Sequence, residues 1–127
     1  MLKTAAELIE KAQQEISCLD VTSAKVLFDN VDNSFIIDVR ETESVRNNKV
    51  RQSIHISRGL LEMEISQHCP YAESTILVHC AGGGRASLAA LTLKNMGYKE
   101  VYAITADFND IKTVFDFWST EELSFIF

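Results

Sequence analysis

The chain has 127 residues, a length typical of one domain and sufficient to bury a core without disulfide staples. Hydrophobic residues make up 46% and charged residues 24%, as in an ordinary globular protein, and the net charge of −6 comes without any basic block, which argues against a nucleic-acid partner. No apolar run reaches the roughly 18 residues of a membrane span, and the amphipathic first residues lack the apolar region of a signal peptide. We therefore expect one domain over residues 1–127 and no membrane partner.

Three cysteines are present, Cys18, Cys69 and Cys80. Their odd number and unrelated spacing make a poor disulfide framework, and no Cys-x-x-Cys pair indicates zinc. A reduced, cytoplasmic setting fits this usage best. We predict no metal site and no cofactor, because no His, Cys or Asp cluster has ligand spacing.

Helical spacing of apolar residues predicts an N-terminal helix from Thr4 to about Ser17, within a helical extension over residues 1–17. Thr4 and Glu7 form a capping-box pattern at its start. The helix either packs on the domain or makes a homodimer contact. Residues 18–20 then read as a short extended connection.

A second helix is expected over residues 22–30, with an apolar inner face and a turn after it. The apolar run at residues 35–39 predicts a strand buried on both faces, as in a parallel sheet. The elements expected next are a short helix and loop at 41–51, a very short strand at 54–56, and a helix at 59–67 ended by Pro70.

Residues 75–79 form the second apolar run and predict the central strand, which a helix over 85–96 follows. Gly97 stands where a left-handed residue commonly ends a helix. A strand at 101–104, a helical stripe from Phe108 to Trp118 and an apolar tail at 119–127 complete the chain. We expect the tail to fold back onto the domain or to touch a partner. Strands that alternate with helices indicate an α/β domain with a parallel sheet.

The residues with the clearest chemistry lie between the central strand and the helix after it: Cys80, Ala81, Gly82, Gly83, Gly84 and Arg85. Successive glycines let backbone N–H groups converge on one point, and a helix N-terminus adds its dipole. A thiol at that point is favoured as a thiolate nucleophile, and an arginine fork suits an oxyanion. The plainer alternative is a structural glycine turn beside an inert, buried Cys80.

The segment from His79 to Tyr102 resembles the active-site segment of single-domain rhodanese-like sulfurtransferases. The upstream Ile37-Asp-Val-Arg-Glu41 is similar to the strand-end signature of that family, and residues 53–62 look like the segment between the two motifs. The resemblance covers about residues 34–118.

This resemblance implies a doubly wound, mostly parallel five-stranded sheet, with Cys80 carrying a sulfane sulfur as a persulfide. The donor would be a small sulfur-containing anion such as thiosulfate or a polysulfide, and the acceptor cyanide or a thiol. It also implies that residues 81–85 form the loop that stabilises the thiolate and the persulfide. Asp38 and Arg40 would lie at the pocket wall. Arg58, which directly precedes Gly59, has two alternatives: a place at the pocket mouth or an ordinary surface charge.

Loop length separates two chemistries on this fold. Cys80 to Arg85 is six residues, the size found in sulfurtransferases, whereas the related dual-specificity phosphatases use seven. A phosphatase or arsenate reductase is therefore disfavoured. A non-catalytic sulfur carrier, a sulfur sensor or a protein-interaction module is the other alternative.

Two segments depart from the family pattern. Residues 48–53 replace a glycine- and proline-containing run, and Ala106-Asp107 replaces a glycine pair, so we expect an altered pocket rim. Arg40 is either a substrate ligand or an arginine in a surface salt bridge. Asp38 either has an electrostatic role at the site or only accepts hydrogen bonds from backbone groups at the strand end. His79 should point away from Cys80, because neighbouring side chains alternate along a strand. Cys69 has a weak alternative as a resolving thiol.

Overall fold

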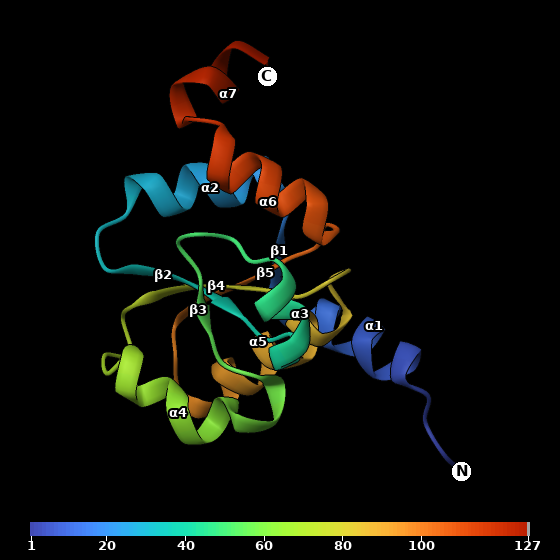
Figure 1. The fold of residues 1–127 in the computed structure, drawn as a ribbon. Coiled ribbons are helices and arrows are strands. Elements are labelled where there is room, and N and C mark those ends of the chain that lie inside the picture. Colours follow the sequence, from blue (N-terminus) through green and yellow to red (C-terminus); the bar gives the residue numbers. More distant parts are fainter. Residues whose placement is uncertain (127) are drawn as a thin grey trace.

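Five parallel strands form the centre of the computed structural model, which describes residues 1–126, with side chains described through Leu123 (Figure 1). Their order across the sheet is β1-β5-β4-β2-β3, and every pairing is parallel. The expected five-stranded α/β sheet is thus confirmed. The strands are β1 (Ser17–Leu19), β2 (Ser34–Asp38), β3 (Ile54–His55), β4 (Thr75–His79) and β5 (Glu100–Ile104).

Helices cover both faces of this sheet (Figure 1). One face carries α2 (Val21–Asn30) and α6 (Phe108–Phe117), and the other carries α1 (Ala5–Glu15), α4 (Leu61–His68) and α5 (Gly84–Met96). Shorter helices are α3 (Thr42–Asn47), a 3-10 turn η1 (Arg58–Leu60) and α7 (Thr120–Ile126). No helix within residues 1–126 is both long and apolar enough to cross a bilayer.

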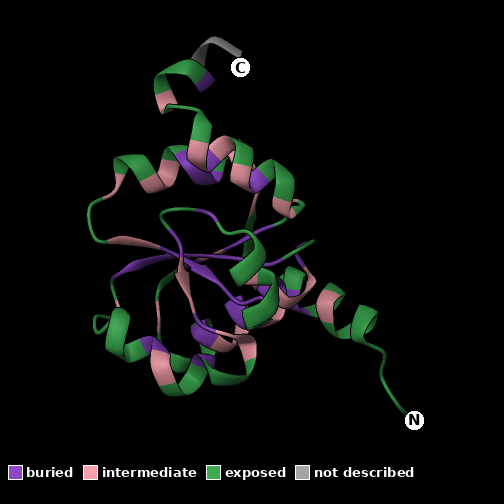
Figure 2. Cartoon of the chain, viewed as in Figure 1, coloured by how far each residue is buried: buried purple, intermediate pink, exposed green. Residues whose placement is uncertain are grey.

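The apolar runs of β2 and β4 explain why these two strands lie inside the sheet. Ile36 and Leu77 face the α2 and α6 layer, whereas Ile37 and Val78 face the α4 and α5 layer. A strand with helices on both sides needs apolar residues at every position, because neither of its faces meets water. Figure 2 shows the buried residues concentrated in the strands and on the inner sides of the helices.

The N-terminal helix begins as predicted. Thr4 caps it by accepting a hydrogen bond from the Glu7 amide, and Ala12 is fully buried on its inner face. The extended connection expected at residues 18–20 is, in the structure, part of strand β1. Cys18 pairs with Ala103 of β5, so tertiary pairing makes an edge strand of a segment that carries no strand pattern of its own.

The helix expected at residues 59–67 is divided in the structure. The 3-10 turn η1 opens it, and the α-helical part starts at Leu61. Gly97 ends α5 with φ of +114°, the left-handed conformation that its position in the sequence predicts.

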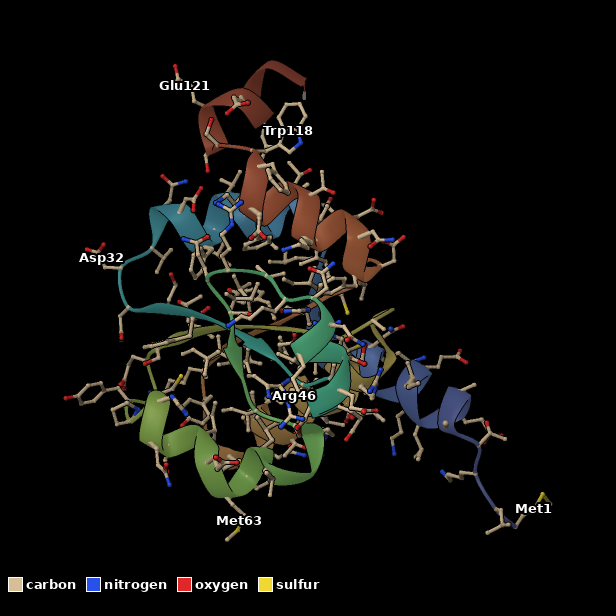
Figure 3. The ribbon with its side chains drawn as sticks, viewed as in Figure 1. Met1, Asp32, Arg46, Met63, Trp118 and Glu121 are labelled. Atoms are coloured by element: carbon tan, nitrogen blue, oxygen red, sulfur yellow. The ribbon has the colours of Figure 1, made fainter. Side chains whose placement is uncertain are left out.

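The C-terminal tail folds back onto the domain, at least as far as Leu123. The Thr120 hydroxyl donates to Asp29 of α2 over 2.6 Å, and Leu123 is buried. Figure 3 places Trp118 where α6 gives way to α7. The side chains of residues 124–127, which supply most of the expected apolar character of the tail, lie outside the described part of the chain.

Candidate active site

The carboxyl end of β4 is where the sheet reverses its order of winding. After β2 the chain adds β3 on one side, and it then returns to add β4 and β5 on the other. In doubly wound sheets the strand ends at such a reversal border the crevice where ligands bind. Cys80 follows β4 at this point, and its side chain packs with the α4 and α5 layer.

The Cys80 sulfur is held by two backbone donors from the loop that follows it. The Gly83 amide lies 3.1 Å and the Ala86 amide 3.3 Å from Sγ. Gly83 adopts φ of +99°, and α5 begins at the next residue. Amides that point at a sulfur from a helix N-terminus stabilise negative charge on it. The loop therefore presents two backbone donors to a buried sulfur, an arrangement that favours negative charge at this position.

The three glycines of the loop differ in how much space their surroundings leave for a side chain. A Cβ on Gly83 would meet the Thr105 Cα at 3.3 Å in addition to the strain of its positive φ. A Cβ on Gly84 would approach the Ile9 Cδ1 of α1 to 2.9 Å, whereas one on Gly82 would meet nothing within 4 Å. Close approach of α1 and of Thr105, the residue after β5, to the loop is a feature that the glycine pattern alone did not indicate.

Arg85 lies at the first turn of α5 and is partly exposed. Its side chain makes no hydrogen bond or ion pair with any other residue in the described range 1–126. Its guanidinium is consequently available to bind an anion beside the loop.

Asp38 and Arg40 are brought together, but on the other side of the sheet from the Cys80 side chain. Arg40 donates to both carboxylate oxygens of Asp38 over 2.9–3.1 Å, and to the Asn48 carbonyl over 2.7 Å. The Arg40 guanidinium also lies 3.8 Å from the centre of the Phe108 ring. Both charged residues are buried, so the surface salt bridge considered for Arg40 is wrong.

The carboxyl group of Asp38 remains ionised in this buried setting. Burial by itself raises its pKa, but the hydrogen bonds from Arg40, together with the neighbouring His79, hold the pKa below its ordinary value of 3.8. The pair is linked to the loop indirectly, because the Phe108 amide donates to the Ala81 carbonyl over 2.9 Å.

His79 points away from Cys80, as the alternation along the strand predicts. Its ring is fully buried and packs against Phe108, and its Nε2 lies 3.8 Å from an Asp38 oxygen. Neither ring nitrogen has a hydrogen-bond partner among the described residues. Burial lowers the pKa of His79 below 6.5, although the Asp38 charge opposes that shift. The ring is therefore neutral at pH 7.

Arg58 is not brought into contact with the loop. Its guanidinium donates to Glu62 over 3.0 Å and to Thr92 over 2.9 Å, which joins η1 to α4 and α5. A place for Arg58 at the pocket mouth stays a prediction.

The two segments that depart from the family pattern are both tied to α6. The Arg51 amide donates to Asp116 over 3.0 Å, and Lys112 reaches the Lys49 carbonyl over 2.6 Å. Asp107 caps α6 by accepting from the Asp110 amide over 2.9 Å.

Cys69 cannot resolve Cys80 in this fold. Cys69 follows α4 at the amino end of β4, where Tyr98 donates to its carbonyl, whereas Cys80 follows the carboxyl end. The length of the strand separates two cysteines whose Cα atoms would have to approach within about 7 Å to form a disulfide. Burial also raises the pKa of Cys69 to about 11.

Ser87 and Gln13 also belong to the surroundings of the loop, and the sequence motifs did not indicate them. Ser87 bonds to the Gly83 carbonyl, and Gln13 reaches Ser87 from α1. The only sequence signal for Ser87 is its position four residues after Gly83, one helical turn away. Within residues 1–126, no group of three or more His, Cys, Asp or Glu side chains is arranged to hold a metal ion.

The molecule is an α/β protein with a doubly wound parallel sheet, and its candidate site is a glycine loop at the switch point whose amides contact the Cys80 sulfur. A family model described as "Rhodanese-like domain" matches residues 5–113. The chain therefore belongs to the rhodanese-like family.

Solved structures with a similar fold include proteins with different descriptions. A protein of unknown function from Rhodopseudomonas palustris, described as a possible tyrosine phosphatase, is 28% identical over 90% of this chain and 92% of its own, with a TM-score of 0.75. The polysulfide-sulfur transferase homodimer of Wolinella succinogenes is 26% identical over 89% of this chain and 83% of its own, with a TM-score of 0.69. A rhodanese with anions from E. coli is 27% identical over 57% and 86% of the two chains, with a TM-score of 0.55.

Proposed function

We propose that this protein is a sulfurtransferase that carries a sulfane sulfur as a persulfide on Cys80. The observation that carries the proposal is the placement of the Cys80 sulfur 3.1 and 3.3 Å from two backbone amides. The same loop ends at Arg85, whose side chain has no partner in the described chain. Those donors fit a sulfur atom that bears negative charge both before and after transfer. Membership of a family that includes sulfurtransferases supports the same chemistry.

The first step is attack of the Cys80 thiolate on the outer sulfur of a donor anion. The sulfur–sulfur bond of the donor breaks, its electron pair leaves with sulfite from thiosulfate or with the shortened chain from a polysulfide, and Cys80 becomes a persulfide anion. Gly83 and Ala86 donate to the cysteine sulfur, and Arg85 binds the anionic donor and the leaving group.

The second step returns the cysteine to its starting state. Cyanide or a thiolate attacks the terminal sulfur, the new carbon–sulfur or sulfur–sulfur bond forms, and the Cys80–sulfur bond breaks to give back the thiolate. No oxidant or general base is required, because each leaving group is already an anion. His79 takes no part, since it is buried on the opposite face of the sheet.

Steady-state assays of the intact protein test the proposal. We expect thiocyanate to form from cyanide with thiosulfate or polysulfide as donor, and Cys80→Ser to abolish this activity. Cys69→Ser is the matched control and should retain it, because Cys69 lies at the other end of β4. Full turnover by Cys80→Ser would refute the assignment of the nucleophile.

Two alternatives have distinct outcomes in the same experiments. A Cys80 persulfide that forms but is passed to neither cyanide nor thiols would identify a sulfur carrier or sensor. Cys80-dependent hydrolysis of an aryl phosphate without sulfur transfer would favour the phosphatase activity suggested by the description of the Rhodopseudomonas palustris protein. The six-residue loop argues against that second outcome.

The setting and assembly of the protein are also proposals. All three cysteines are free thiols, which supports a reducing, cytoplasmic location. The relative from Wolinella succinogenes is a homodimer. A dimer of this chain through α1 would have to use its outer face, because Ala12 on the inner face is buried within the chain. The C-terminal tail is the other proposed contact.

A further inference from the structure

The Cys80 loop contains three consecutive glycines, so no side chain of theirs fixes its shape. Glycine has more backbone freedom than any other residue, and that freedom must be removed if an amide is to stay on the sulfur. Gly83 is the critical residue, because its own N–H is the donor that lies 3.1 Å from Sγ. Its φ of +99° is one of several conformations open to a glycine.

The Gly83 carbonyl is held by two hydrogen bonds from the same residue. The Ser87 amide donates to it over 2.9 Å, as an ordinary α-helical bond, and the Ser87 hydroxyl donates to it over 2.7 Å. The helix needs only the first of these bonds. The second adds a restraint on the one glycine whose N–H points at the sulfur, and Ser87 is fully buried where it makes this bond.

Helix α1 determines which way the Ser87 hydroxyl points. The Gln13 side-chain amide donates to the Ser87 oxygen over 3.0 Å. A serine hydroxyl can rotate, but a donor that occupies its lone pair directs its hydrogen toward the remaining acceptor. That acceptor is the Gly83 carbonyl. Ile9, one turn earlier on α1, meets the adjoining Gly84 so closely that a Cβ there would lie 2.9 Å from its Cδ1.

We infer that Ser87 and Gln13 are positioning residues that hold Gly83 with its N–H directed at the Cys80 sulfur. Helix α1, which carries Gln13, therefore contributes to the geometry of the site. The relay runs from Gln13 through the Ser87 hydroxyl and the Gly83 carbonyl to the Gly83 amide on Sγ. The effect of this relay on sulfur transfer rests on the proposed function, whereas its effect on the reactivity of the Cys80 thiol does not.

The test is the rate at which iodoacetamide alkylates Cys80 at pH 7, measured by mass spectrometry on the full chain. We expect Ser87→Ala to slow alkylation about fivefold, which corresponds to the loss of one hydrogen bond worth about 1 kcal/mol. Gln13→Ala should slow it about twofold to threefold, because the hydroxyl is then free to rotate. Gln14→Ala is the matched control, because Gln14 is the next residue on α1, and its side chain is exposed and has no partner in the described chain. Cys80 in this variant should be alkylated at the parent rate.

The double variant separates a relay from two independent effects. Because Gln13 acts only through the hydroxyl, Gln13→Ala should add nothing in a Ser87→Ala background. Gln13 is exposed, so Gln13→Ala tests the relay even if Ser87→Ala, which removes a buried hydroxyl, disturbs folding. Parent-like or faster alkylation by both single variants would overturn the inference, as would effects that multiply in the double variant.

Sulfur transfer measured on the same variants keeps the two proposals apart. If the parent protein transfers no sulfur but Ser87→Ala still slows alkylation, the proposed function fails and the relay stands. If the parent transfers sulfur and both variants alkylate at its rate, the relay fails and the proposed function stands.

Discussion

Gly82 and Gly83 follow each other in the cysteine loop but occupy different backbone regions. Only Gly83 has a positive φ, and only Gly83 would bring a Cβ against the Thr105 backbone. The sequence presents three equivalent glycines, because a run of identical letters cannot show which one turns the chain. The structure assigns the turn to the middle glycine, which also supplies an amide to the sulfur.

This difference gives a matched pair of variants. Gly83→Ala should lower the free energy of unfolding by about 1–3 kcal/mol, because an alanine in the left-handed region is strained. It should also slow alkylation of Cys80, since the amide moves off the sulfur. Gly82→Ala should stay within about 0.5 kcal/mol of the parent protein. Urea unfolding of both variants measures the difference, and equal losses would contradict the assignment of the turn to Gly83.

At the scale of single residues, the sequence predicted the loop geometry around Cys80 well and the surroundings of Asp38 and Arg40 less well. Cys80 follows the central strand, and the loop amides reach its sulfur as the motif predicts. Asp38 and Arg40 lie close by, but they form a buried ion pair on the opposite face. Burial of a charged pair depends on what packs over it, here the Phe108 ring, and no local pattern reports that.

Among the elements, the apolar strands β2 and β4 were predicted best and the edge strand β1 worst, whereas the other edge strand, β3, was predicted. The runs at β2 and β4 are visible because both faces of those strands are buried. Strand β1 is only three residues long and largely exposed, so its sequence shows neither alternation nor an apolar run. Strand β1 forms because it pairs with the otherwise open edge of β5. This pairing depends on the assembled sheet and cannot be seen in the local sequence.

The segment at residues 48–53 is held to α6 by a buried carboxylate. The Asp116 side chain has no exposed surface, and it accepts from the Arg51 amide over 3.0 Å and from Lys112 over 2.7 Å. Asp116→Ala should therefore cost about 1–3 kcal/mol, because it leaves the Arg51 amide without its acceptor and removes one of the two acceptors of the Lys112 ammonium group.

Arg51→Ala is the control for that variant. The Arg51 side chain is 67% exposed and lies 3.8 Å from Asp116, so it contributes little, while its backbone amide is retained in the variant. We expect a change within about 0.5 kcal/mol. Chemical denaturation compares the two, and an Arg51→Ala loss as large as that of Asp116→Ala would show that the side-chain ion pair, rather than the carboxylate–backbone bond, secures the segment.

For the whole molecule, buried groups predict how stability depends on pH. The pKa of His79 is lowered below 6.5 by burial, so in acid the unfolded chain binds this proton more readily than the folded one. Stability should be complete above pH 6.5 and fall on acidification toward the folded pKa, by at most about 1.4 kcal/mol per pH unit for one proton. Asp38, whose pKa lies below 3.8, acts in the same direction at lower pH.

Replacement of the histidine isolates its contribution. His79→Leu should remove the part of the decline that starts at pH 6.5 while leaving the decline below pH 3.8, because a leucine side chain binds no proton. Thermal unfolding across this pH range measures both, with exposed His68→Asn as the control. A decline of the same size in His79→Leu would mean that other groups set the acid stability.

The account as a whole depends on where sulfur becomes attached to the protein. The direct measurement is mass spectrometry of the intact protein and its peptides after incubation with polysulfide or thiosulfate, followed by addition of cyanide. The account predicts one added sulfur atom on Cys80 and loss of that atom when cyanide is added. It predicts none on Cys69, because burial raises the pKa of that thiol to about 11 and Cys69 lies at the other end of β4. A protein that takes up no cyanide-labile sulfur on Cys80 would contradict it.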